Sequence, residues 1–185
     1  MRVIAGVAKG RRLAALRTLA LRPTPARVRA ALFNILGDRT QDACMLDLCA
    51  GTGALGLEAL SRGAQAVVFV DMHAPACRLI AKNLHTCGLL ERARVWQGDV
   101  LRVLPLLKAA AERFDLIFLD PPYQTFLVED TLQQLGDGVL LAPEGQIVAE
   151  HFFKRAPLDY YGRVSRIRLA RFGDVALSFY HIAGR

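Results

Sequence analysis

Between residues 44 and 120 the chain alternates short apolar runs with segments of helical periodicity. The runs MLDLC, VVFVD and FDLIFLD consist almost entirely of apolar side chains and carry an acid at or near their ends. Strands that are buried on both faces of a parallel sheet have this pattern. It predicts four strands, at residues 44–49, 66–71, 93–97 and 114–120, and three helices, at residues 54–62, 74–87 and 100–113.

The segment after residue 120 predicts the other half of the same sheet. Its pattern indicates one helix and three strands, near residues 127–135, 146–150, 164–170 and 175–182. The strands together predict an α/β fold with a seven-stranded, mostly parallel sheet whose last strand runs antiparallel.

The segment before residue 44 predicts a hairpin and a helix. Residues 2–5 and 11–16 are expected to form two short strands around a glycine-flanked turn. A helix is expected at residues 26–36, with Thr24 as N-cap, Pro25 in the first helical position and Gly37 at the end. We therefore treat residues 1–40 as an N-terminal extension and residues 41–185 as the main domain.

The distribution of charge indicates a polyanionic partner. The 185 residues are 53% hydrophobic and 22% charged, which suits a folded domain, and their net charge is +7. Residues 1–40 carry +8, residues 41–150 carry −6 and residues 151–185 carry +5. Because Lys and Arg contacts to phosphate supply most non-specific nucleic-acid affinity, the basic ends predict a nucleic-acid-binding face.

The cysteines and the hydropathy exclude several other classes. Cys44, Cys49, Cys77 and Cys87 lack the spacing of metal ligands, so we expect free thiols and no metal. No apolar run reaches the roughly 18 residues of a membrane span, and the first residues lack the apolar core of a secretory signal. We expect a cytoplasmic protein.

A glycine motif marks a nucleoside-binding site. The sequence Asp47-Leu-Cys-Ala-Gly51-Thr-Gly53-Ala-Leu-Gly56 follows the first predicted strand of the alternation and opens a helix. Such glycines let a backbone approach a bound cofactor, and the helix N-terminus offers free N–H groups. With Asp71 about 20 residues further on, the motif by itself suits a dinucleotide equally well.

Two more acids favour a cationic cofactor over a dinucleotide. Asp47 lies inside the strand, where it can organise an ammonium group and would repel a pyrophosphate. Gly98-Asp99 ends the third predicted strand, where Asp99 can accept a hydrogen bond from an adenine amino group. Acids at three successive strand ends point to a cofactor with an ammonium and a sulfonium group.

The fourth predicted strand ends in Asp120-Pro121-Pro122-Tyr123, which suits methylation of an amino group. An exocyclic amine on a base is a weak nucleophile because its lone pair is delocalised into the ring. Asp120 and the carbonyl of Pro121 can accept its hydrogens, and Tyr123 can stack on the base. Rate would then come from proximity and alignment.

These motifs resemble a known family, the class I S-adenosylmethionine-dependent methyltransferases with a D-P-P-Y motif. Within that class the chain is similar to the bacterial 16S rRNA methyltransferases that modify a guanine at N2. The resemblance rests on motifs spread along the chain: Arg2-Val-Ile-Ala-Gly6, Lys9-Gly10-Arg11, Leu21-Arg22-Pro23-Thr24, Arg27-Val-Arg29, Ala31-Leu-Phe33-Asn34, the glycine motif, Asp120–Tyr123, Leu141-Ala142-Pro143 and Glu150-His151. It implies a Rossmann-like fold and a flipped guanine in ribosomal RNA, within an assembling small subunit, as substrate.

The resemblance also implies roles for individual residues. The guanine would be held by Asp120, Pro121, Pro122 and Tyr123. S-adenosylmethionine would be held by Asp47, Cys49, Gly51, Thr52, Gly53, Asp71, Met72, Gly98, Asp99 and Val100. RNA would be contacted by Arg2, Lys9, Arg11, Arg12, Arg22, Pro23, Thr24 and Arg27, of which residues 22–24 would flank the active site.

Three alternatives stay open at this point. A DNA or other RNA methyltransferase acting on adenine N6 or cytosine N4 would share the D-P-P-Y motif, although no segment resembles a separate target-recognition domain. An NAD-linked dehydrogenase would share the glycine motif. An RNA-binding module that has lost catalysis would share the fold. For the rRNA methyltransferase we expect a monomer.

Overall fold

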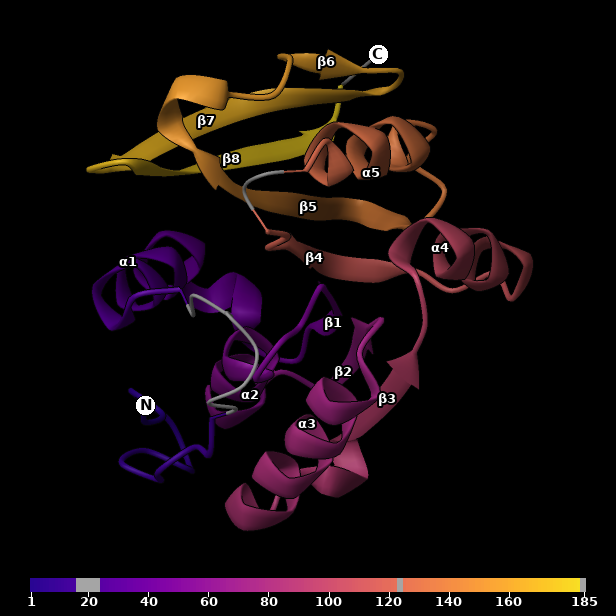
Figure 1. Ribbon diagram of the computed structural model, residues 1–185. Coiled ribbons are helices and arrows are strands. Elements are labelled where there is room, and N and C mark those ends of the chain that lie inside the picture. Colours follow the sequence, from indigo (N-terminus) through magenta and orange to yellow (C-terminus); the bar gives the residue numbers. More distant parts are fainter. Residues whose placement is uncertain (16–23, 123–124, 184–185) are drawn as a thin grey trace.

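A single mixed sheet forms the centre of the protein. The computed structural model describes residues 1–15, 24–122 and 125–183, and in them eight strands follow the order β3-β2-β1-β4-β5-β8-β7-β6 (Figure 1). The strands are β1 (Cys44–Leu48), β2 (Ala66–Asp71), β3 (Ala93–Gln97), β4 (Phe114–Leu119), β5 (Leu141–Phe152), β6 (Tyr160–Tyr161), β7 (Val164–Phe172) and β8 (Val175–Ile182). Strands β1 to β5 pair in parallel, whereas β8, β7 and β6 are added by antiparallel pairing.

The predicted α/β fold is confirmed, and the strand count and some strand ends are corrected. The eighth strand is β6, a two-residue strand that pairs only with β7 in the described part of the chain and is too short to show a hydrophobic pattern. Strand β5 begins at Leu141 instead of residue 146, because Leu141 pairs with Phe114 across an irregularity in the register. Strand β1 ends one residue early because Cys49 has a left-handed backbone (φ 60°).

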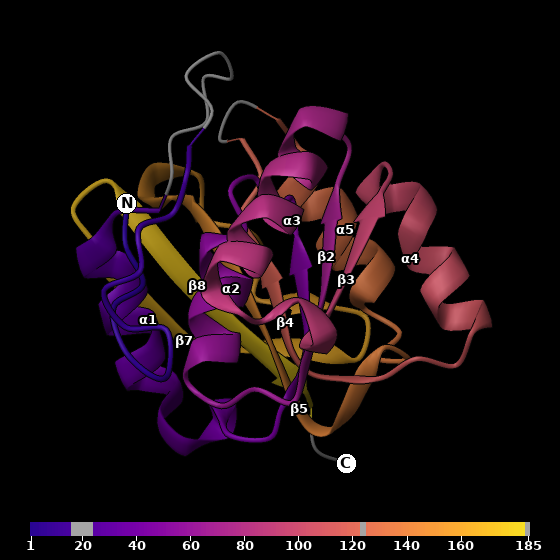
Figure 2. The same ribbon diagram turned by 90° about the horizontal axis from the view of Figure 1, so that it is seen from below.

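Helices cover both faces of the sheet (Figures 1 and 2). Side chains of α1 (Ala26–Leu36), α2 (Ala54–Ser61) and α3 (Ala74–Cys87) pack into one apolar core, and those of α4 (Val100–Ala109) and α5 (Leu127–Leu135) pack into another. Successive strand residues point to opposite faces, so Met45 belongs to the first core and Leu46 to the second. None of the helices in the described residues is long and apolar enough to cross a membrane.

The N-terminal segment forms a shorter version of the predicted hairpin. An antiparallel bridge joins Arg2 and Arg12. Backbone N–H groups on either side of it also donate across the hairpin: Leu13 to the carbonyl of Met1 at 3.0 Å, Val3 to that of Arg11 at 3.0 Å and Gly10 to that of Val3 at 2.9 Å. The backbone N–H groups of Ile4 and Ala5 instead donate to the Glu58 carboxylate of α2, at 2.7 and 3.0 Å. Because Ile4 and Ala5 bond a side chain of α2, the paired part of the first strand ends at Val3 instead of residue 5, and the hairpin lies against α2.

Candidate active site

Four acids lie together at one edge of the sheet. The parallel pairing of β1 with β2 and β4, and of β2 with β3, brings the carboxyl ends of these strands to a common edge. Asp47, Asp71, Asp99 and Asp120 all lie at these ends, and their negative charges all act on the thiol of Cys49. Burial, followed by these four charges, raises the pKa of that thiol far above its usual value. The structure therefore brings together the acids that the sequence places at successive strand ends.

Two of these acids shape the glycine loop. Asp71 accepts hydrogen bonds from the N–H of Gly51 at 2.8 Å and from that of His73 at 2.8 Å. Asp47 accepts one from the N–H of Gly56 at 2.9 Å. Each carboxylate thus ties the turn after β1 to the end of a strand, which fixes the backbone that a cofactor would contact.

The glycines in this loop serve two purposes. Gly53 has a left-handed backbone (φ 74°), which side-chain-bearing residues rarely adopt. Gly56 has no such backbone, but a Cβ there would lie 2.3 Å from the ring of Phe69. It is a glycine because α2 packs closely on β2, so this position serves helix packing.

The electrostatics of this edge suit a cationic ligand. Asp47 is only 1% exposed, and burial together with the charge of Asp71 raises its pKa to about 7, against the opposing effect of the Gly56 N–H. Among the described residues, every charge that acts on the Cys49 thiol is negative. A positive ligand would relieve this repulsion and a pyrophosphate would increase it. The donor set fits the ammonium and sulfonium of S-adenosylmethionine and does not fit a dinucleotide.

The remaining predicted cofactor residues border the same loop. Asp99 caps α4 by accepting a hydrogen bond from the N–H of Arg102 at 3.2 Å. Met72 is 58% exposed next to Asp71, whereas Thr52 and Val100 are buried. The N–H of Gly98 donates to the carbonyl of Asp71 at 3.0 Å, which joins the ends of β2 and β3.

The loop after β4 holds Asp120 beside the acidic edge. Asp120 is partly buried, and its N–H donates to the carbonyl of Leu48 at 3.3 Å. Its pKa is raised well above the usual value, first by burial and then by the charges of Glu150 and Asp47. A hydrogen bond from Thr24 acts in the opposite direction. The result is a carboxylate with an unusually high affinity for a proton.

Thr24 corrects the sequence analysis on one point. It does not cap α1, because Pro25 occupies the N-cap position and no side chain caps the helix. The hydroxyl of Thr24 donates instead to Oδ2 of Asp120 at 2.6 Å, across 96 residues of sequence. Thr24 thus flanks the acid, as the resemblance implies, while Arg22, Pro23 and Tyr123 lie outside the described residues.

Pro121 and Pro122 differ in their surroundings. Pro121 is buried and Pro122 is exposed. The carbonyl of Pro122 accepts hydrogen bonds from the N–H and the hydroxyl of Thr125, at 3.3 and 3.0 Å. This turn connects the end of β4 to α5.

Two buried polar residues of the site were missed in the sequence. Asn83 of α3 donates to the carbonyl of Thr52 at 3.1 Å and also bonds the backbone N–H and carbonyl of Ala14, at 2.8 and 3.2 Å. It therefore ties the N-terminal segment to the glycine loop. Glu58 holds the start of that segment, as described above. A polar residue on the apolar face of a predicted helix was the available signal in both cases.

His151 has a structural environment. Its Nε2 lies 2.8 Å from the hydroxyl of Ser178, and its Nδ1 lies 3.1 Å from the carbonyl of Phe152. Burial lowers the pKa of His151. These contacts give the histidine a structural role between β5 and β8.

Most of the predicted RNA-contacting side chains lie on the surface. Among the described residues of this set, Thr24 is buried. The others are exposed: Arg2, Lys9, Arg11, Arg12 and Arg27. Arg29, which contributes to the basic surplus of residues 1–40, is only 1% exposed and pairs with Glu58. Its charge is used inside the protein, so the basic surface is smaller than the count of charges indicates.

Comparison with known proteins identifies the family. A family model described as "Conserved hypothetical protein 95" matches residues 1–181. The chain belongs to this family. A relative from Bacillus subtilis (strain 168), named putative rRNA methyltransferase YlbH, is 37% identical over the whole length of both chains. A relative from Escherichia coli (strain K12), named ribosomal RNA small subunit methyltransferase D, is 38% identical over 81% of this chain and 74% of its own.

A solved structure of a similar protein has the same fold. The structure described as putative methyltransferase yhhF from Escherichia coli matches with a TM-score of 0.85 and 34% identity, over 100% of this chain and 99% of that one. The resemblance to class I methyltransferases is thereby confirmed for the family and for the fold.

Proposed function

We propose that this protein transfers a methyl group from S-adenosylmethionine to the exocyclic N2 of a guanine in 16S ribosomal RNA. The observation that carries the proposal is the position of Asp120, which Thr24 holds beside the other three acids of this edge. A hydrogen-bond acceptor for an amine thus lies next to a site for a cationic cofactor. The choice of 16S rRNA is supported by the name of the Escherichia coli relative.

The glycine loop and the strand ends would hold the cofactor. The residues we assign to it are Asp47, Cys49, Gly51, Thr52, Gly53, Asp71, Met72, Gly98, Asp99 and Val100. The cofactor supplies an electrophilic methyl group on a sulfonium. The carboxylates of Asp47 and Asp71 fix the loop and provide the negative charge that such a cation requires.

Asp120 would orient the guanine amine and then take its proton. Thr24 occupies Oδ2, so the carboxylate is fixed in orientation and Oδ1 can accept a hydrogen from the amine. The carbonyl of Pro121 would accept the second hydrogen, and Tyr123 would stack on the base. As the amine attacks the methyl group, positive charge develops on nitrogen. The raised pKa of Asp120 makes it a suitable acceptor for the proton that the product must lose.

The N-terminal extension, residues 1–40, would contact the RNA. Phosphates would be bound by the basic residues assigned to RNA, while the target guanine leaves its stack to reach Asp120: Arg2, Lys9, Arg11, Arg12, Arg22 and Arg27. We propose an assembling small ribosomal subunit in the cytoplasm as the substrate and a monomer as the active form.

The test is methyl transfer from labelled S-adenosylmethionine to 16S rRNA and to small subunits from cells that lack this enzyme. Mass spectrometry then identifies the modified nucleoside. N2-methylguanosine is expected. Methyladenine or methylcytosine would overturn the choice of base, and cofactor binding without any transfer would overturn catalysis.

An Asp120→Ala variant tests the proposed chemistry. It should abolish transfer and leave cofactor affinity within a few fold, because Asp120 acts on the amine. The matched control is Asp115→Ala, which removes an acid from the same strand. Asp115 accepts a hydrogen bond from the N–H of Cys44 at 2.8 Å, at the other end of β4. Near wild-type turnover in Asp120→Ala would show that the assigned role is wrong.

A further inference from the structure

Two arginine–aromatic pairs lie next to the D-P-P loop, Asp120–Pro122. They lie on the side of this loop that faces away from the glycine loop. Strand β5 is the neighbour of β4 on the side away from β1 and runs parallel to it, so both end at the same edge. A short 3-10 helix, η3 (Phe153–Arg155), follows β5 at this edge. The glycine loop therefore lies on one side of Asp120 and η3 on the other.

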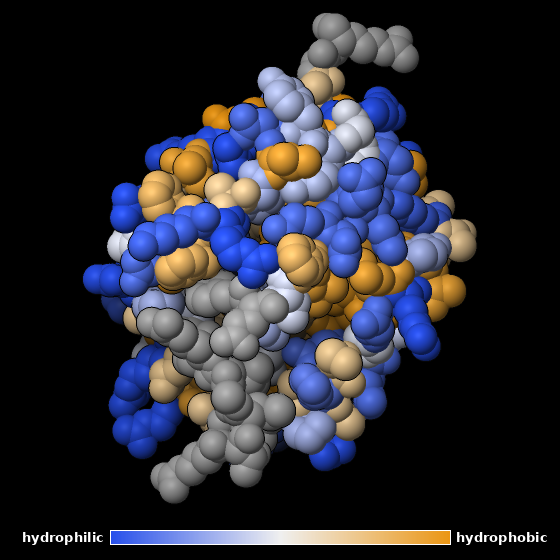
Figure 3. Space-filling model, turned by 45° about the horizontal axis from the view of Figure 1, so that its top comes forward, coloured by the Kyte–Doolittle hydropathy of each residue, from blue (hydrophilic) through white to orange (hydrophobic). Residues whose placement is uncertain are grey.

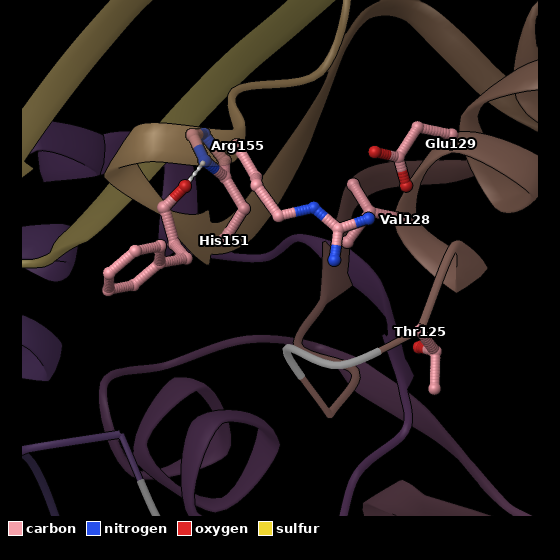
Figure 4. A pocket seen from close by; sticks show the side chains of 6 residues that line it. Thr125, Val128, Glu129, His151 and Arg155 are labelled. Atoms are coloured by element: carbon pink, nitrogen blue, oxygen red, sulfur yellow. Dashed lines mark hydrogen bonds between the residues drawn. The ribbon is translucent and has the colours of Figure 1, made fainter.

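The first pair adjoins the D-P-P loop directly. The guanidinium carbon of Arg155 lies 5.0 Å from the ring centroid of Phe126, which is 69% exposed. Phe126 follows Thr125, the residue that bonds the carbonyl of Pro122. Arg155 and Thr125 also line an open pocket together with Val128, Glu129, His151 and Phe152 (Figure 4). Figure 4 shows Arg155 extending from η3 toward α5 across this pocket.

The second pair connects η3 to β7, next to a turn that approaches α1. The guanidinium carbon of Arg171 lies 3.8 Å from the ring centroid of Phe153. Arg171 also donates to the carbonyl of Gly173 at 2.8 Å, in the turn between β7 and β8. This turn approaches α1, because a Cβ on Gly173 would lie 3.9 Å from a guanidinium nitrogen of Arg27. Since α1 begins just after Thr24, the pairs and α1 border Asp120 on adjoining sides.

We name this surface the arginine–aromatic face: Arg27, Phe126, Phe153, Lys154, Arg155 and Arg171. Its four basic side chains are exposed. Two acids adjoin it: Glu129 lines the pocket, and Asp174 lies in the turn between β7 and β8. Within the described residues neither Arg155 nor Arg171 forms a salt bridge, so their charge is available to a ligand.

The chemistry of this face suits single-stranded RNA. An arginine stacked on a ring keeps its N–H edge free for a phosphate, and an exposed aromatic ring offers a platform for a base. A protein partner would call for a continuous apolar patch. Figure 3 shows hydrophilic side chains over the face of the antiparallel strands with apolar ones scattered among them.

We propose that the arginine–aromatic face binds the nucleotides that flank the target guanine, with Phe126 stacking on a neighbouring base and Arg155 and Arg171 binding phosphates. This inference rests on the proposed function and assigns RNA contacts to the C-terminal part of the chain. The RNA then crosses the D-P-P loop between this face and the N-terminal extension.

The test compares variants in binding and in methyl transfer with 16S rRNA and with small subunits that lack the modification. Phe126→Ala should weaken RNA affinity at least about fivefold, because base–aromatic stacking contributes about that much or more per base. Phe126→Tyr should restore the affinity. The double variant Arg155→Ala/Arg171→Ala should lower the slope of log affinity against log salt by about 1.4, at about 0.7 per phosphate contact on a single strand.

The matched control is Arg39→Ala. Arg39 is an exposed arginine just before β1, and it bonds the carbonyl of Glu144 at 3.2 Å near the amino ends of the strands. The Arg39→Ala variant should leave both the RNA affinity and its salt slope unchanged. In the face variants the KM for RNA should rise, while kcat at saturating RNA and cofactor affinity stay near wild type.

The outcomes separate this inference from the proposed function. If the wild type methylates guanine N2 but the face variants bind and react like Arg39→Ala, the face does not bind RNA and the proposed function stands. If the wild type transfers no methyl group to either RNA, the proposed function fails. Variant effects on binding alone would then still support an RNA-binding face.

Discussion

Replacing Asp47 by asparagine should stabilise the cofactor-free protein while weakening cofactor binding. The carboxylate is 1% exposed, and its pKa is raised from 3.8 to about 7. A shift of about 3 pKa units, at about 1.4 kcal/mol each, means that ionised Asp47 costs the fold about 4 kcal/mol at pH 8. Asparagine still accepts from the Gly56 N–H, but this neutral hydrogen bond is weaker by about 1–2 kcal/mol. The net expectation is a gain of about 2–3 kcal/mol.

The pH dependence has a defined direction. A folded-state pKa above the unfolded value means that protonation stabilises the fold, and that this stability is lost as the pH rises from about 4 to about 7. Asp47→Asn should therefore exceed the wild type most at pH 8 and approach it near pH 4. At pH 8 the melting temperature should rise by about 4–12 °C, since about 2–4 °C corresponds to 1 kcal/mol for a domain of this size.

The assay combines thermal and urea unfolding at pH 4.5, 6 and 8 with calorimetric titration of S-adenosylmethionine. Cofactor affinity should fall about 10- to 100-fold, as expected for a lost hydrogen bond to a charged group. The control is Asp115→Asn, which changes an acid to an amide at the other end of the strands and should alter neither quantity in this way. An Asp47→Asn protein that is no more stable than wild type at pH 8 would refute the argument that burial and Asp71 oppose this charge.

Two other substitutions test contacts that join the N-terminal part of the chain to the main domain. Thr24→Val removes the hydrogen bond that lowers the pKa of Asp120, so the acidic limb of the kcat–pH profile should move to higher pH. Thr24→Ser should restore it, and an unmoved limb in the valine variant would show that the bond does not control Asp120. Glu58→Ala leaves Arg29 buried without its carboxylate, so urea unfolding should show a loss of about 3–5 kcal/mol. A loss below about 1 kcal/mol would mean that the pair does not hold the segment.

Local sequence patterns predicted most elements of the fold. Helix α3 and strands β2, β3 and β8 have the predicted bounds, because apolar runs and helical periodicity depend on which face of each element is buried. The acids at the strand ends were also predicted to lie close together, because the carboxyl ends of parallel strands meet at one edge of the sheet. The family resemblance, carried by short motifs along the whole chain, is confirmed by the match over residues 1–181.

Other features depended on contacts between distant residues. The N-terminal hairpin is shorter than predicted because the N–H groups of Ile4 and Ala5 bond the Glu58 carboxylate of α2, about 54 residues away. Thr24 has the sequence context of a helix cap, and only the folded chain brings its hydroxyl to Asp120.

The sequence by itself therefore determined the alternating architecture, the glycine motif and the place of Asp120 at the end of β4, since each depends on residues close together in the chain. The tertiary structure decided which polar groups are buried together, and burial and neighbouring charge set their pKa values. Asp47 and Asp120 hold protons more tightly than ordinary acids only because the fold removes them from water beside other negative charges.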